Sequence, residues 1–86
     1  MPELCRFLGI SITMYFNDHD PPHFHVRYNE HRGKFSIADL VMIDGDIPPR
    51  VTALVLEWAN IHRMELAANW KSLKEDGSFN RIEPLI

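Results

Sequence analysis

The hydrophobic pattern of this chain changes its period at Pro48-Pro49. Before these prolines, apolar and polar residues alternate and turn residues are frequent, which is typical of β-strands with one covered face. After them, apolar residues recur at spacings of three and four, which indicates a helix. The change predicts an α+β fold, with an antiparallel sheet of three or four strands covered on one face by a long or broken C-terminal helix.

Length and composition limit what such a chain can be. Its 86 residues are 45% hydrophobic and 24% charged, so we expect residues 1–86 to form a single domain with one core. A net charge of −3 disfavours a protein that acts mainly on DNA phosphates, but it leaves room for a local basic face. With one cysteine (Cys5), no secretory signal and no apolar run approaching about 20 residues, we expect a cytoplasmic protein with no membrane partner.

Alternation predicts the positions of the strands. Residues 6–16 read as one strand, residues 23–29 as a second, and residues 34–39 as a third that follows a hairpin turn. A short fourth strand is expected within residues 40–47. Its register stays open, because its first four residues are all apolar.

The C-terminal half carries one apolar stripe at helical spacing. Pro49 suits the first helical position, and Gly77 suits a cap after the last. A straight helix of about 27 residues would measure about 40 Å, which exceeds the diameter of about 31 Å expected for a domain of this size. We therefore expect either a break near residues 60–63 or a far end that packs on something else, such as a second copy. Residues 81–83 could add an edge strand.

Four of the five histidines lie between positions 19 and 31, around the segment His23-Phe24-His25. Burying Phe24 and Val26 is worth about 1.5–3 kcal/mol each, whereas burying two histidines and Arg27 would carry a desolvation penalty. We therefore expect both imidazoles to face away from the core. Their i, i+2 spacing on a strand places them about 6–7 Å apart on one face.

This polar face suggests two kinds of chemistry. In the first, His23 and His25 form an acid–base pair, Arg27 and Lys34 hold a phosphate, and Tyr15 is an orienting donor, a combination that suits phosphodiester cleavage in RNA. In the second, the same histidines bind a divalent transition-metal ion. The third ligand would then come from the preceding loop, which offers Asp18, His19 and Asp20. A polar face with no chemistry remains a third interpretation.

The chain also resembles a small bacterial family known only as domain of unknown function 4160. The resemblance rests on residues 6–10 and 14–16, residues 18–28, residues 55–59, and residues 69–70 with 82–85. The segment Pro-Pro-His-Phe-His-Val at residues 21–26 is its most specific part. The family's polar turn between strands three and four is replaced here by Asp-Leu-Val at residues 39–41.

The resemblance implies a prokaryotic source, a compact α+β fold and no established activity. It also implies a two-gene module, as in toxin–antitoxin pairs. Our first hypothesis is accordingly a toxin-like protein that acts on RNA, or on a small protein encoded by a neighbouring gene, through the face bearing His23 and His25. The alternatives are a metal-binding module that uses the same histidines, and a non-catalytic interaction protein that forms a homodimer through its helix.

Overall fold

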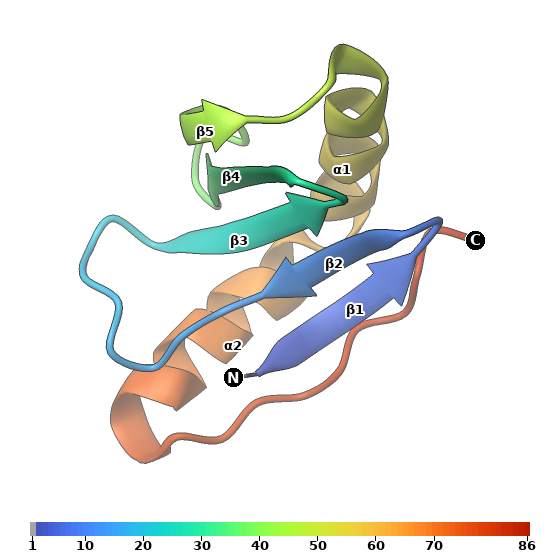
Figure 1. The fold of residues 1–86 in the computed structure, drawn as a ribbon. Helices are drawn as coiled ribbons and strands as arrows, with labels where there is room; N and C mark the ends of the chain where they lie inside the picture. The colour runs from blue at the N-terminus through green and yellow to red at the C-terminus, as the bar shows by residue number, and fades with distance from the viewer. Residues whose placement is uncertain (1) are drawn as a thin grey trace.

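The computed structural model describes residues 2–86 and contains five strands and two helices. The strands form one antiparallel sheet in chain order, and both helices lie on one side of it (Figure 1). The α+β class is confirmed, but the expected three or four strands are in fact five. In chain order the elements are β1 (Glu3–Phe7), β2 (Ile10–Thr13), β3 (His23–Tyr28), β4 (His31–Ser36), β5 (Met42–Asp46), α1 (Pro49–Ile61) and α2 (Arg63–Asp76).

The extra strand arises because residues 6–16, predicted as one strand, contain a hairpin. Leu8 and Gly9 form a two-residue turn in which both residues have positive φ, 51° and 77°. Such primed turns match the twist of paired strands. The turn makes Phe7 and Ile10 cross-strand partners and buries both, whereas Leu8, which a single strand over residues 6–16 would place on the same side as Ile10, is exposed. Simple alternation misses a turn that reverses the chain in two residues.

The later strands lie close to the predicted ones. β3 matches the predicted second strand, and β5 falls within residues 40–47. β4 begins and ends three residues earlier than expected, so it shares only residues 34–36 with the predicted third strand, because only Asn29 and Glu30 form the turn before it. Asn29 has a φ of 54°, a left-handed conformation that asparagine tolerates well. The earlier start places Arg32 and Gly33 in the sheet.

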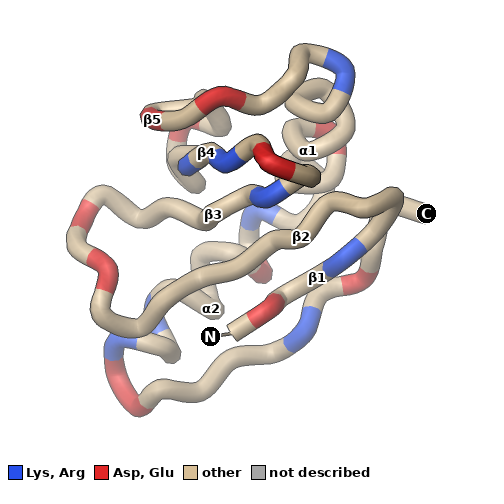
Figure 2. The backbone as a smooth tube through the Cα atoms, in the orientation of Figure 1, with Lys and Arg blue, Asp and Glu red and all other residues tan. Residues whose placement is uncertain are grey.

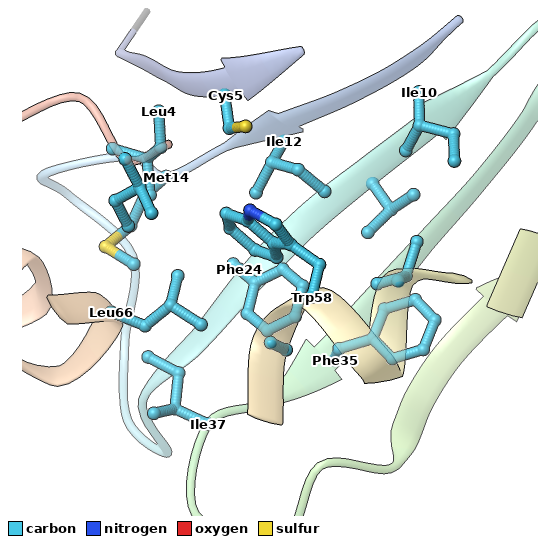
Figure 3. Close-up of a cluster of buried hydrophobic side chains, with 14 of the residues drawn as sticks. Leu4, Cys5, Ile10, Ile12, Met14, Phe24, Phe35, Ile37, Trp58 and Leu66 are labelled. Carbon is cyan, nitrogen blue, oxygen red and sulfur yellow. The ribbon is translucent and has the colours of Figure 1, made fainter. Parts of the chain in front are cut away.

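The core lies between the sheet and the helices, with Trp58 of α1 at its centre (Figure 3). The Trp58 ring packs against Phe7 and Phe24 of the sheet, with ring centroids 6.1 Å apart in both pairs. Phe24 in turn stacks on Phe35 of β4 at 5.6 Å. All four aromatic side chains are buried, and large buried aromatic rings contribute much of the hydrophobic stabilisation of a small core.

Of the two alternatives for the helical region, the structure has the break near residues 60–63. His62 leaves helical geometry at φ −110° and ψ 24°, between α1 and α2. The break divides the helical region into two shorter helices, which fit within a molecule whose radius of gyration is 11.7 Å. Gly77 ends α2 in the left-handed conformation at φ 79°, as a C-terminal cap. No helix within residues 2–86 is long and apolar enough to cross a membrane.

The chain end runs alongside β1 without forming the edge strand suggested for residues 81–83 (Figure 1). The Ile82 amide donates to the Leu4 carbonyl at 2.8 Å, and the Trp58 indole donates to the Glu83 carbonyl at the same distance. Asn69 of α2 exchanges two hydrogen bonds with the backbone of Asn80. Side chains of the helices therefore hold this segment against the first strand.

Candidate functional site

The loop between β2 and β3 brings the candidate site together. The Lys74 ammonium group of α2 donates to the Phe16 carbonyl at 3.1 Å, and the Ile37 amide donates to the Pro22 carbonyl at 3.1 Å. Within the loop, the Asp18 amide donates to the Tyr15 carbonyl at 3.3 Å. These bonds tie both ends of the loop to the rest of the fold, so its middle has a defined position.

Asp18 is the loop residue that meets the histidines of β3. Its Oδ2 atom accepts a hydrogen bond from His25 Nε2 at 2.9 Å and lies 3.3 Å from His23 Nε2. The two imidazole rings have centroids 5.1 Å apart and are inclined at 68°. One ligand atom from each of these three residues lies within 4.8 Å of the other two. We refer to Asp18, His23 and His25 as the triad.

The sequence predicts three loop residues as possible third ligands, and the structure brings only one of them to the histidines. Asp18 is half-buried and joins the triad, whereas His19 and Asp20 are exposed and lie outside it. The choice depends on how the loop folds back, which spacing along the chain does not determine.

His23 differs from the expectation that both imidazoles face away from the core. The rings lie together and Phe24 points into the core, as predicted, but the His23 side chain is only 6% exposed, against 23% for His25. The reason is Trp70 of α2, whose ring centroid lies 5.2 Å from that of His23. Strand alternation does not show that a residue from the second helix covers the start of β3.

The tautomer of His23 follows from its hydrogen bond. Its Nδ1 atom lies 2.8 Å from the Pro21 carbonyl oxygen. A carbonyl oxygen only accepts, so Nδ1 carries a proton, and in the neutral ring Nε2 is left with a lone pair. This Nε2 is buried and has no hydrogen-bond partner within residues 2–86. Asp18 Oδ2 is near it, but not in hydrogen-bonding geometry.

The triad matches the donor set of a divalent transition metal. Metal–nitrogen and metal–oxygen bonds of about 2.0–2.2 Å, at tetrahedral or octahedral angles, place neighbouring donors about 2.8–3.6 Å apart. The two nitrogen–oxygen distances in the triad, 2.9 and 3.3 Å, fall in this range, and a bound ion would replace the proton of the hydrogen bond between His25 Nε2 and Asp18. The bond from His23 Nδ1 to a backbone carbonyl is also the usual way to orient an imidazole ligand.

A groove of about 810 Å³ lies beside the triad on the sheet face opposite the helices. Its lining comes from all five strands, and we call it the open-face groove. It includes Tyr15, His25, Arg27 and Lys34, which the sequence assigned to this face. Tyr15 packs edge-on against His25, with ring centroids 4.6 Å apart. His23 is not part of the lining, so only His25 of the two histidines lines the groove.

Two groove residues were missed by the sequence analysis. Arg32 was placed in a turn, but it lies in β4 as the direct cross-strand partner of Arg27. Arg6 lies on β1 and donates to Glu3 Oε2, which also accepts from Ser11. These hydrogen bonds lower the pKa of the Glu3 carboxyl, with the Arg6 bond as the largest cause. A signal was available for Arg32, because it shares the parity of Lys34.

A family model described as a domain of unknown function, DUF4160, matches residues 9–71, which include the loop, the triad and most of both helices. This agrees with the resemblance in the sequence. No curated protein and no solved structure matches the chain.

Proposed function

Because the chain belongs to the DUF4160 family, whose description names no activity, we propose its function from the site: the triad binds one divalent transition-metal ion. The observation that carries this proposal is the buried Nε2 atom of His23, which has no hydrogen-bond partner within residues 2–86. A buried polar atom left unpaired costs about 1–3 kcal/mol. An ion between this nitrogen and Asp18 would remove that cost.

A proton is the alternative to a metal at this position. A proton on His23 Nε2 would need an acceptor. Its partner would be Asp18 Oδ2 at 3.3 Å, but the two groups are not oriented as donor and acceptor. An ion needs only the lone pairs of both atoms, so the geometry favours the metal.

The arrangement favours a metal that takes part in chemistry over a purely structural one. Structural zinc sites use four protein ligands, whereas catalytic sites keep a position open beside three. The triad supplies three, and His25 borders the open-face groove. A bound ion would supply a Lewis acid that activates water at neutral pH. The residues' own part is to hold the ion, with Pro21 fixing the His23 ring and Asp18 placed between both imidazoles.

A metal-free acid–base role is the second candidate, and one observation favours it. His25 lies 2.9 Å from Asp18 and lines the groove, so this pair resembles a carboxylate that orients a histidine base. His23 is buried behind it, which suits a supporting role better than contact with substrate. A toxin-like function within a two-gene module would accommodate either chemistry. It predicts growth arrest on induction that is lost in the His23→Ala, His25→Ala double variant.

The test is the metal content of untagged protein purified from metal-replete cells, measured by plasma mass spectrometry. We expect close to one transition-metal ion per chain, with strong loss in His23→Gln and Asp18→Asn. The matched control is His31→Gln, since His31 is a partly exposed histidine of β4 outside the triad. Content below roughly a tenth of an ion per chain, or equal loss in the control, would contradict the proposal.

A further inference from the structure

The open-face groove concentrates positive charge on a chain that is acidic overall. The net charge is −3, yet the lining holds four bases, Arg6, Arg27, Arg32 and Lys34, against two acids, Glu3 and Asp44. Lys and Arg positions on β3 and β4 lie side by side in the middle of the sheet, while β5 carries acids (Figure 2). The bases are therefore gathered over the central strands.

Within the described residues, three of these bases form no ion pair with an acidic side chain. Within residues 2–86, the ion pairs of lysine and arginine side chains are Arg6–Glu3 and Arg81–Glu3. Asp46 and Asp44 are the cross-strand partners of Arg32 and Lys34, but neither forms an ion pair with them. Arg27, Arg32 and Lys34, which we call the basic cluster, are thus free to bind a ligand.

The register of β3 and β4 places the positive charges of the basic cluster close to one another, which is unfavourable. Arg27 lies directly opposite Arg32, and Lys34 follows two residues after Arg32 on the same face. Like charges directly opposite each other on paired strands are destabilising. Such a destabilising pair of like charges is expected where the charges serve binding. Two arginine side chains are well suited to bind the oxygens of a phosphate.

The shape of the groove favours a strand over a single phosphate. The lining extends from β1 to β5, four interstrand spacings of about 4.8 Å each, so the groove is about 19 Å across. It also contains Tyr15, which is half-buried against His25. Proteins that bind single-stranded nucleic acid combine a basic groove with aromatic side chains on which bases stack.

From these observations we propose that the open-face groove binds single-stranded RNA, with the basic cluster on its phosphates and Tyr15 against a base. His25 is the cross-strand neighbour of Lys34, so a phosphate held by Lys34 lies next to the triad. The RNA would then be the substrate of the metal centre, a step that rests on the proposed function. Binding itself depends on the groove alone.

The experiment is fluorescence anisotropy of a labelled single-stranded RNA of about 12 nucleotides, titrated with protein in EDTA at low salt. We compare wild type with the variant Arg27→Gln, Arg32→Gln, Lys34→Gln. The control is Arg50→Gln, Arg63→Gln, Lys71→Gln, which removes the same charge from exposed helix positions. Thermal melts of each variant establish that it is folded.

We expect the groove variant to bind at least roughly tenfold more weakly and the control to change less than roughly twofold. The negative slope of log K against log salt should become less steep by about 2 in the groove variant, since each of the three phosphate contacts on a single strand contributes about −0.7. Wild type that does not bind, equal losses in both variants, or equal binding of polyglutamate would overturn the proposal. Because RNA binding is measured in EDTA, it does not depend on bound metal. The groove variant should keep its metal content, and His23→Gln should keep its affinity for RNA.

Discussion

At the scale of single residues, His23 combines three features that bear on metal binding. It is buried, one ring nitrogen is fixed by the Pro21 carbonyl, and the other has no hydrogen-bond partner within the described part of the chain. The alternation of β3 predicted that Phe24 points inward and that the two histidines share a side. It could not predict the burial of His23, because the cover is Trp70, which belongs to a helix distant in sequence.

This environment predicts a stability effect that depends on metal. In EDTA, His23→Leu should change the free energy of unfolding by less than about 1 kcal/mol, because losing the Pro21 bond is offset by removing an unpaired nitrogen. With zinc at 100 times its dissociation constant, wild type should gain about 2.7 kcal/mol and the variant nothing. Urea denaturation with and without zinc measures both. A variant that gains as much as wild type would show that His23 is not a ligand.

Cys5 gives a second prediction at this scale. Its side chain is 1% exposed, and burial raises the pKa of its thiol. The thiolate is the reactive form, so both effects slow modification. At pH 8 the native protein should react with a disulfide reagent at least roughly a hundredfold more slowly than the protein in urea. Similar rates in both states would mean that the start of β1 opens readily.

At the scale of elements, the hairpin between β1 and β2 carries an unusual residue. Leu8 has a φ of 51° at the first turn position, a conformation that favours asparagine or glycine. Since Leu8 is 55% exposed, replacing it removes little buried surface. Leu8→Asn should therefore raise the free energy of unfolding by about 0.5–1 kcal/mol.

Chemical denaturation of wild type and Leu8→Asn tests this, with Leu8→Val as the matched control. A β-branched residue at positive φ should lower stability instead. If the Leu8→Asn variant is less stable than the Leu8→Val variant, the turn geometry is not as described. The same turn explains why the number of strands was underestimated. Leucine is unfavourable in such a tight turn, so Leu8 gives no sign in the sequence that the chain reverses there. The helix break was easier, because length left only two alternatives, a break near residues 60–63 or a far end packed on something else, and the structure has the break.

At the scale of the whole molecule, Glu3 links distant parts of the chain. It accepts hydrogen bonds from Arg6 and Ser11 and lies 3.7 Å from Arg81 of the C-terminal segment. Its pKa is lowered in the folded state, chiefly by the Arg6 bond, so the folded state favours the ionised carboxyl. Its stabilisation is therefore present above the unfolded pKa and is lost as pH falls through the folded pKa.

Glu3→Gln should thus destabilise the protein at pH 7 by less than about 1 kcal/mol, since its main partner, Arg6, is exposed and solvent screens the pair. The difference between variant and wild type should shrink as pH is lowered from about 5 through the folded pKa. Urea denaturation at several pH values follows it. A difference that stays constant down to acid pH would mean that the charge of Glu3 contributes nothing.

The overall architecture was predictable in class, while the assembly of the site was not. The change of period at Pro48-Pro49 predicted sheet followed by helix, and residue parity predicted the shared face of His25, Arg27 and Lys34. The union of Asp18 with the histidines depends on a loop tied down by α2. Such contacts between elements distant in sequence leave no periodic signal.

The central claim is that the triad is a metal centre, and X-ray absorption spectroscopy of zinc-loaded protein tests it most directly. The account predicts two imidazole nitrogens and one carboxylate oxygen among the ligands at about 2.0–2.2 Å, with one imidazole lost in His23→Gln. Zinc bound without imidazole ligands, or a spectrum unchanged by that substitution, would contradict it.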